Sequence, residues 1–274
     1  MRIDSHVHLW TYDRERDTWI TDEMKVLQRD FLPGDLSGEI RENGIDACIT
    51  VQAGQTEKET LFLLEMSRRY PFIKGVVGWI DFRNPEVGTR LEYFSQFPVI
   101  RGWRHIVQDE PPDFLSGPDF RRGIRELTRF GYTYDLLVYQ SQLGAALDFV
   151  RDFPDQPFVL DHCGKPGIRE KNMDTWKPLI YEMAGCPNLT CKLSGLITEA
   201  DWLHWEEGDI YPYLDVAFDA FGTDRLLFGS DWPVMQLAGN YSRWVRLLEN
   251  YIGDPGSETG KKIFGQNAID FYKL

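Results

Sequence analysis

Short apolar runs alternate along the chain with longer stretches in which apolar residues recur at helical spacing. The runs are dense in Val, Ile, Leu, Phe and Tyr, which is typical of parallel strands covered on both faces. We predict eight strands, at residues 2–8, 45–52, 73–80, 99–107, 133–139, 158–163, 188–194 and 225–231. Eight strands alternating with helices predict a (β/α)8 TIM-type barrel of the α/β class, as a single domain over residues 1–274.

Several predicted helices carry start and stop signals. Thr56 and Glu59 form a capping-box pattern before a helix that Pro71 ends. Asp119 opens a second helix, which Gly131 closes. Further helices are predicted over SRWVRLLENYI and KKIFGQNAIDFY. An open doubly wound sheet is the rival fold, but it normally shows a Gly-rich phosphate loop after the first strand, and here that strand ends in HVH.

The longest irregular stretches each follow a predicted strand. They cover residues 9–34, 108–118, 164–175 and 195–210. A barrel places its active site in the loops that leave the carboxyl ends of its strands, so we expect the site there.

The composition of the chain limits the kinds of molecule and surface that the protein is expected to bind. The formal net charge is −13, which argues against nucleic acid and against an anionic membrane surface. No apolar run approaches the roughly 20 residues of a membrane span, and MRIDSHVHLW is not a secretory signal. The four cysteines fit neither a zinc ribbon nor a C-x-x-C pair. We therefore expect a cytoplasmic protein with reduced thiols.

The strongest chemical signal is the pair His6 and His8. Residues two apart on a strand point to the same side, so both imidazoles share one face and Val7 takes the other. Imidazole binds divalent metals and also donates hydrogen bonds to a substrate carbonyl. Two packed structural histidines are the alternative interpretation, and support must come from other strand ends.

That support comes from the sixth and eighth predicted strands. VLDHCG places His162 at the end of one, and LLFGSDWP places Asp231 at the end of the other. A closed barrel makes its last strand a neighbour of its first, so Asp231 is expected beside His6 and His8. A carboxylate there can bind a metal or take a proton from water. A helix N-cap is the structural alternative for Asp231.

Other polar residues also stand at strand ends. Arg104 and His105 are adjacent, so at most one should face the interior, and the same holds for Tyr134 and Asp135. Lys192 shares a face with Ser194, and a buried Lys needs a partner or a substrate. We take as candidate substrate contacts Lys192, Arg104, His105 and Ser194.

Tryptophan is frequent, with nine residues, and a flat apolar ring suits a sugar. Trp10 and Trp232, at strand ends, are added to the candidate substrate contacts, although packing under loops explains them equally well. Cys163 follows His162 directly, and adjacent strand residues diverge, which excludes a nucleophile–base pair. His204 is expected at the surface.

Six motifs occur in order along the whole chain: IDSHVHLW, RDFLPGDL, RGWRHIVQDEP, LDHCGKPGI, CKLSGLITEADW and FGSDWPV. With these motifs the sequence resembles the amidohydrolase superfamily, and within it the amidohydrolase-2 group of L-fucono- and L-rhamnono-lactonase types. The resemblance implies a distorted (β/α)8 barrel and hydrolysis of a cyclic ester. It also implies substrate contacts for Lys192 and for Arg104 or His105, and catalytic roles for His6, His8, His162 and Asp231.

Superfamily members with two metals use a Lys near the fourth strand. Here that strand ends in RHIVQ, which argues against a binuclear centre. The resemblance leaves two options. One divalent metal ion, with Zn²⁺ favoured, is held by His6, His8, His162 and Asp231, or the site works without a metal.

The predicted reaction converts a sugar lactone and water to an aldonic acid. Asp231 acts as general base, and the three histidines polarise the carbonyl through a metal or directly. One alternative is a metal-dependent decarboxylase of the same superfamily, which would need an Arg cluster. The other is a non-catalytic barrel that binds a sugar acid, which would need no base. The sequence leaves open whether the protein is a homo-oligomer.

Overall fold

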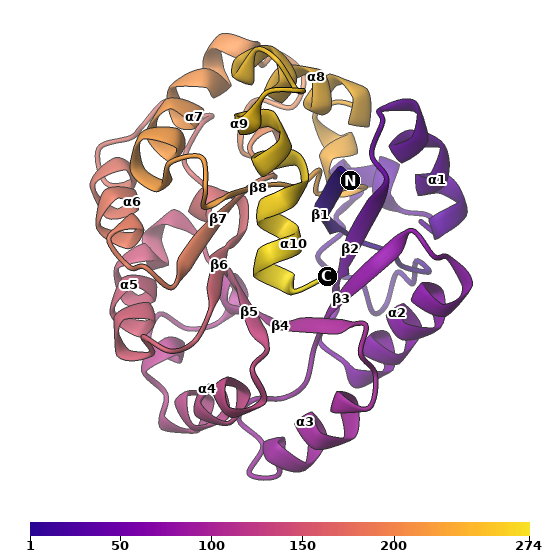
Figure 1. Cartoon of the computed structure of the whole chain (residues 1–274), viewed down its shortest axis with the longest axis vertical. Helices are drawn as coiled ribbons and strands as arrows, with labels where there is room; N and C mark the ends of the chain where they lie inside the picture. Colours follow the sequence, from indigo (N-terminus) through magenta and orange to yellow (C-terminus); the bar gives the residue numbers. More distant parts are fainter.

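The computed structural model describes residues 1–274, which form one eight-stranded parallel sheet in the order β1 to β8. The sheet curves into a ring with the helices outside it (Figure 1). The predicted barrel is confirmed. Its strands are β1 (Ile3–Val7), β2 (Ala47–Val51), β3 (Ile73–Gly78), β4 (Ile100–Ile106), β5 (Thr133–Leu137), β6 (Phe158–Leu160), β7 (Leu189–Leu193) and β8 (Leu226–Phe228).

The barrel closes between its first strand and the segment that follows β8. The backbone N–H of Asp231 donates to the carbonyl of His6 at 2.9 Å, and that of His8 donates to the carbonyl of Trp232 at 2.7 Å. Val7 bridges Trp232 in parallel. Closure therefore brings residue 231 beside residues 6 and 8, as the sequence predicts.

Two predicted strands overrun their carboxyl ends the most, by three residues each, and both errors fall at the site. The predicted strand 158–163 ends at Leu160, because His162 and Cys163 take positive φ values of 55° and 52°. The predicted strand 225–231 ends at Phe228, and Asp231 has a φ of 60°. Left-handed turns are rare for such residues. These turns redirect the side chains of His162 and Asp231 at the strand ends and distort the barrel there.

Eight helices follow the eight strands in turn and cover the outside of the barrel. They are α1 (Pro33–Glu42), α2 (Glu57–Arg69), α3 (Val87–Ser95), α4 (Pro118–Phe130), α5 (Leu143–Asp152), α6 (Trp176–Ala184), α7 (Glu207–Phe221) and α8 (Tyr241–Ile252). None of the helices is long and apolar enough to cross a membrane.

The helix-capping interactions predicted from the sequence form only in part. The Thr56 hydroxyl accepts from the N–H of Glu59 at 3.2 Å, but the Glu59 carboxylate accepts from the N–H groups of Ala53 and Gly54 instead of that of Thr56. Only half of the predicted capping box forms, because Glu59 ties down the loop after β2. Gly131 ends α4 with a φ of 72°, as predicted.

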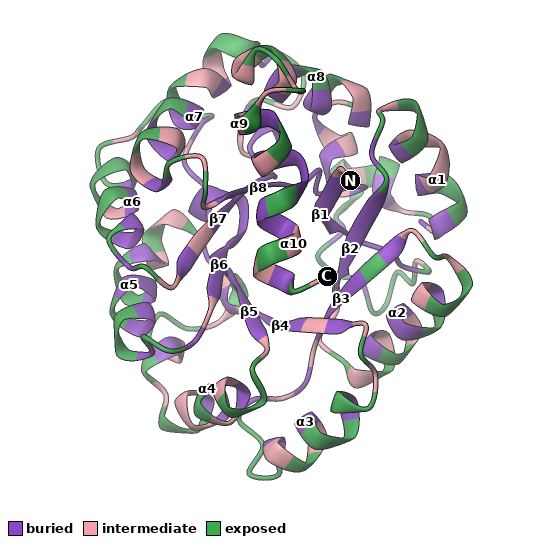
Figure 2. Ribbon diagram, in the orientation of Figure 1, coloured by how far each residue is buried: buried purple, intermediate pink, exposed green.

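The last predicted helix is split and lies across the barrel. It comprises α9 (Glu258–Lys261), a π-helical turn at Lys262–Gln266, and α10 (Asn267–Tyr272). In Figure 1 α10 (yellow) crosses the end of the barrel that faces the viewer, and Figure 2 shows buried, intermediate and exposed residues along it. Ala268 and Tyr272 pack against the barrel interior with residues such as Ile3, Ile49 and Leu227. The amino end of the barrel is thereby closed.

Candidate active site

A pocket of about 340 Å³ opens at the carboxyl ends of the strands. Four polar residues from the strand ends form part of its wall, namely His8, Arg104, His162 and Asp231. Loops that follow β1, β4, β6, β7 and β8 form most of the rest of its sides. Their contributions include Trp19, Met24, Gln108, Asp109, Lys165, Thr198, Glu199, Trp202, Val234 and Leu237.

His6, His8 and Asp231 form a compact group of donor atoms. The Nε2 atoms of the two histidines are 3.1 Å apart, which confirms that both rings face the same side. Asp231 Oδ1 lies 3.3 Å from His8 Nε2 and 3.8 Å from His6 Nε2. His8 Nδ1 lies 2.8 Å from the carbonyl oxygen of Val51, which can only accept, so Nδ1 donates to it and Nε2 is the nitrogen that faces Asp231.

His162 adjoins this group from the turn after β6. Its ring centroid is 4.6 Å from that of His6, and its Nδ1 is 2.8 Å from the Ser194 hydroxyl. A Cβ on Gly195, whose φ is 63°, would lie 2.6 Å from His162 Nδ1. Glycine is therefore needed at position 195 to admit the imidazole. His162 also forms a second donor group with His6 and Asp161.

A buried charge network lies beneath the histidines. Lys192 Nζ is 2.5 Å from Asp135 Oδ2, 3.0 Å from Asp161 Oδ1 and 3.1 Å from His6 Nδ1. Arg104 reaches Asp161 Oδ2 from the pocket side at 3.0 Å. Lys192, Asp135 and Asp161 have no exposed surface, so each of these charges is compensated only by the others.

Burial and neighbouring groups shift the pKa values of the site residues. Burial lowers the pKa of His6 well below its usual value and that of His162 to about 4, so both rings are neutral at pH 7. Burial raises the pKa of Asp231, but His162, His8 and His6 outweigh it and hold that pKa below its ordinary value. The site thus presents an ionised carboxylate beside neutral imidazoles.

The structure separates Arg104 from His105. Arg104 faces the interior and lines the pocket. The ring of His105 faces the surrounding helices, stacks on Phe114 with centroids 4.7 Å apart and has its Nε2 2.7 Å from Glu110. The predicted place of His105 among the substrate contacts does not agree with this position, because strand alternation turns it away from the pocket.

Four other predicted substrate contacts do not line the pocket either. Lys192 faces the interior but lies too deep, and Ser194 is fully buried against His162. Trp10 packs on Trp19 and Phe31 under the first loop. Trp232 also packs on Phe31. These residues lie behind the pocket wall, and their contact with substrate stays a prediction.

Several pocket residues were not predicted. Lys165 and Glu199 come from different loops and form an ion pair of 3.6 Å on the wall. Trp202 and Trp19 line the same pocket. Asp161 was also missed, although it precedes His162 directly in LDHCG. The signal for Asp161 was the need of the buried Lys192 for a partner.

Comparison with known proteins decides the family. The model of the amidohydrolase family matches residues 3–274. The chain belongs to this family. The resemblance seen in the motifs is thereby confirmed.

Curated relatives of this amidohydrolase are similar along their full length. It is 40% identical to an L-fucono-1,5-lactonase of Burkholderia multivorans, covering 100% of this chain and 96% of that protein. A second protein of that name, from Burkholderia ambifaria, is 33% identical over the same shares of both chains. A crystal structure of an amidohydrolase from Burkholderia multivorans with bound Zn superposes with a TM-score of 0.97 at 38% identity, covering 100% of this chain and 99% of that one.

The donor atoms of this amidohydrolase fit a zinc ion. Zn²⁺ binds imidazole nitrogen and carboxylate oxygen at about 2.0–2.2 Å, so ligands around one ion lie about 3–3.5 Å apart. His6 Nε2, His8 Nε2 and Asp231 Oδ1 are separated by 3.1, 3.3 and 3.8 Å. The neutral His6 ring and the ionised Asp231 carboxylate have the protonation states that ligation requires. His162 lies next to this group as the predicted fourth donor.

Proposed function

We propose that this amidohydrolase hydrolyses a sugar lactone of the L-fucono-1,5-lactone type to the aldonic acid. The observation that carries the proposal is the ionised Asp231 on the wall of a pocket beside His8 and His162. The lactonase names of the relatives at 40% and 33% identity supply the substrate class.

Asp231 is proposed as the group that takes the proton of the attacking water. Its low pKa keeps the carboxylate ionised throughout the neutral range, and its position at the pocket floor lets it reach a water beside a bound lactone. Once the ring ester opens, the same carboxyl group can return the proton to the leaving alkoxide. Asp231 thus serves both halves of the reaction.

The reaction also requires stabilisation of the negative charge that develops on the lactone carbonyl oxygen. His162 and Arg104 line the pocket and can donate toward that oxygen. His6, His8 and Asp231, with His162 adjoining, would hold one zinc ion. When bound, zinc polarises a carbonyl and lowers the pKa of water to about 7.

The pocket walls suit a polyhydroxylated ring that carries an apolar substituent. We assign sugar hydroxyls to Lys165 and Glu199, whose charged ends meet on the wall at 3.6 Å. Trp202 and Trp19 offer flat faces for the ring, and Met24, Val234 and Leu237 offer apolar surface for a methyl group.

The two alternatives are less favoured. A decarboxylase has to hold a carboxylate substrate, but Arg104 is the one arginine on the pocket wall, and it is bound to Asp161 and Gln52. The similarity to a dihydroxybenzoate decarboxylase is 15% in sequence, which shows a shared fold alone. A barrel that only binds sugar acid would gain nothing from an anionic carboxylate on its floor.

Acid release from sugar lactones tests the proposal. Purified protein is mixed with L-fucono-1,5-lactone in weak buffer containing a pH indicator, with Asp231→Asn protein as the control for spontaneous opening. We expect acid release well above that control, a loss of activity on treatment with a chelator and recovery with Zn²⁺. Inactivity on every aldonolactone, combined with CO₂ release from an aromatic acid, would favour the decarboxylase.

We further propose that the enzyme works in the cytoplasm. All four cysteines are buried and unpaired, which suits a reducing compartment. Its partner is a small uncharged lactone rather than nucleic acid, in keeping with the net charge of −13.

A further inference from the structure

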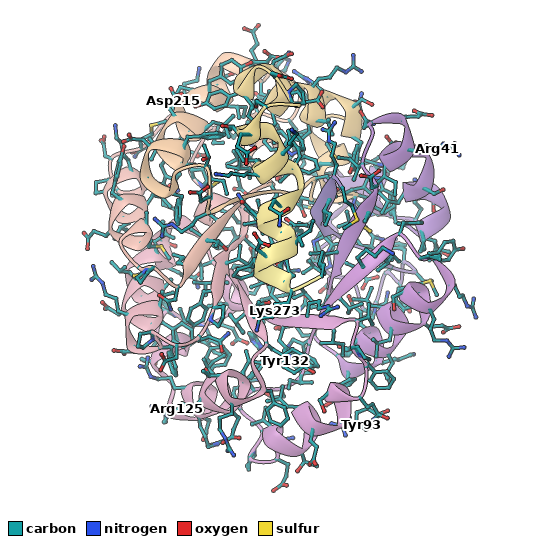
Figure 3. All side chains as sticks on the ribbon, viewed as in Figure 1. Arg41, Tyr93, Arg125, Tyr132, Asp215 and Lys273 are labelled. Carbon is teal, nitrogen blue, oxygen red and sulfur yellow. The ribbon has the colours of Figure 1, made fainter.

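The C-terminal helix sends one polar group into the barrel. Tyr272, the last residue of α10, is 1% exposed, and its hydroxyl lies 3.0 and 2.9 Å from the two carboxylate oxygens of Asp135 on β5. The next residue, Lys273, donates to the carbonyl of Gly131 at 3.1 Å just before β5. Figure 3 labels Lys273 close to Tyr132 at this end of the barrel. Tyr272 therefore enters from the end opposite the pocket.

Two further contacts lead from Asp135 to the site, and the Lys192 ammonium also lies 5.6 Å from the centroid of the Tyr272 ring. Asp135 Oδ2 lies 2.5 Å from Lys192 Nζ, and the same ammonium is 3.1 Å from His6 Nδ1. Asp161 Oδ1 is 3.0 Å away on the other side of the ammonium. Lys192 is thus shared by two carboxylates and one imidazole. Its position depends on how well each carboxylate is satisfied by other groups.

Tyr272 is the second hydrogen-bond partner of Asp135, beside Lys192. Asp135 has no exposed surface, and its side chain forms hydrogen bonds only with Lys192 and with Tyr272. A buried carboxylate that loses one partner draws the remaining cation more strongly. Loss of the hydroxyl would therefore pull the ammonium toward Asp135 and away from His6. The orientation of the His6 ring depends on the group that faces its Nδ1.

We propose that Tyr272 is a positioning residue of the active site, acting on His6 through Asp135 and Lys192. The C-terminal helix then has a second task besides closing the barrel. The kinetic test of this inference rests on the proposed function. The spectroscopic test rests on the geometry alone.

The first test compares Tyr272→Phe with Tyr251→Phe. Both variants remove a hydroxyl that donates to an aspartate, but the Tyr251 bond to Asp215 is on the surface between α8 and α7. For Tyr272→Phe we expect kcat and zinc affinity each to fall about 10-fold, the lower end of the usual effect of groups that orient metal-binding histidines. KM should stay within about 2-fold, since the substrate walls are untouched. Tyr251→Phe should match the wild type.

A double-mutant cycle and a spectrum separate positioning from a loss of stability. If Tyr272 acts through Asp135, the kcat loss from Tyr272→Phe should largely vanish in an Asp135→Asn background. Should Asp135→Asn not fold, ¹⁵N spectra of Tyr272→Phe decide, because the five histidines give few ring signals and His6→Asn assigns those of His6. We expect the His6 signals to shift the most. Folded Tyr272→Phe with wild-type kcat, zinc affinity and His6 signals would overturn the inference. If the wild-type protein is inactive on lactones but the His6 signals still shift in Tyr272→Phe, only the proposed function is refuted.

Discussion

His8 Nε2 lies 3.3 Å from Asp231 Oδ1, although the two residues follow the first and the last strand of the barrel. Barrel closure creates this contact, and neither strand could form it alone. An imidazole nitrogen and an ionised carboxylate thereby share one side of the pocket. Lactone hydrolysis needs a general base and an electrophilic group that are close enough to act on the same substrate.

Asp231→Asn tests the base. The amide keeps the shape of the side chain but cannot accept a proton, so kcat should fall by about 10²–10⁴-fold, the usual range for a positioned acid–base group. KM should change much less, because the interaction is lost mainly in the transition state. Initial rates on a lactone series measure both constants.

The control for Asp231→Asn is Asp148→Asn, which removes one negative charge from an exposed position on α5. Zinc content has to be measured on the same preparations, because Asp231 is also a proposed ligand. Folded Asp231→Asn protein with normal zinc content and near-normal kcat would show that another group activates the water.

Arg104 and His105 should respond differently to substitution. His105→Gln removes a ring that lies against Glu110 and Phe114 outside the pocket, so it should lower the free energy of unfolding by about 1–3 kcal/mol with kcat/KM unchanged. Arg104→Gln removes a pocket cation and leaves Asp161 short of a partner, so kcat/KM should fall sharply. Urea unfolding and kinetics on both variants measure this. A larger kinetic loss in His105→Gln would contradict the orientation of β4.

The Lys165–Glu199 pair should control recognition of hydroxyl groups. A hydrogen bond from a charged group contributes about 1.5–3 kcal/mol, so Lys165→Met should raise KM for a sugar lactone by about 10–100-fold with a smaller effect on kcat. Lys171→Met is the control, since Lys171 pairs with Asp209 at an exposed site beyond the pocket. A lactone without hydroxyls should show no KM change. An equal KM rise for both lactones would contradict the assignment.

The sequence could predict which side of a strand a residue faces, but not how deep it lies. The period of two correctly placed His6 and His8 together, and barrel order brought Asp231 beside them. The same period correctly turned Lys192 inward. It could not show that Lys192 lies below the histidines, where Asp135 and Asp161 surround it, because depth depends on strand stagger in the closed barrel.

Loop residues escaped prediction for a different reason. Lys165 and Glu199 meet because two irregular segments fold over the same pocket, and no sequence period encodes such a contact. The left-handed turns at His162 and Asp231 were also missed, since both follow apolar runs that look like continuous strands. In each case local pattern predicted the element correctly and tertiary packing set its end.

The low pKa of His162 has a consequence for stability. Burial lowers this pKa to about 4, whereas in the unfolded chain it is near 6.5. Above about pH 6.5 the ring is neutral in both states and contributes no pH dependence. Between about pH 6.5 and 4 the unfolded chain binds a proton that the folded protein does not. The free energy of unfolding should therefore fall as the pH falls through this window.

His162→Gln isolates that contribution, because the glutamine does not titrate while the other buried histidines remain. From pH 7 to pH 5 metal-free wild-type protein should lose about 2 kcal/mol more unfolding free energy than the variant, since each pH unit within the window costs about 1.4 kcal/mol. Urea unfolding of chelator-treated samples at both pH values measures the difference. Chelation is needed because zinc release at low pH would add its own destabilisation. A gap between wild type and variant that stays constant from pH 7 to pH 5 would mean that folding does not lower the pKa of His162. The ring would then be partly protonated at pH 6, and its proposed service as a neutral donor or ligand would fail below neutrality.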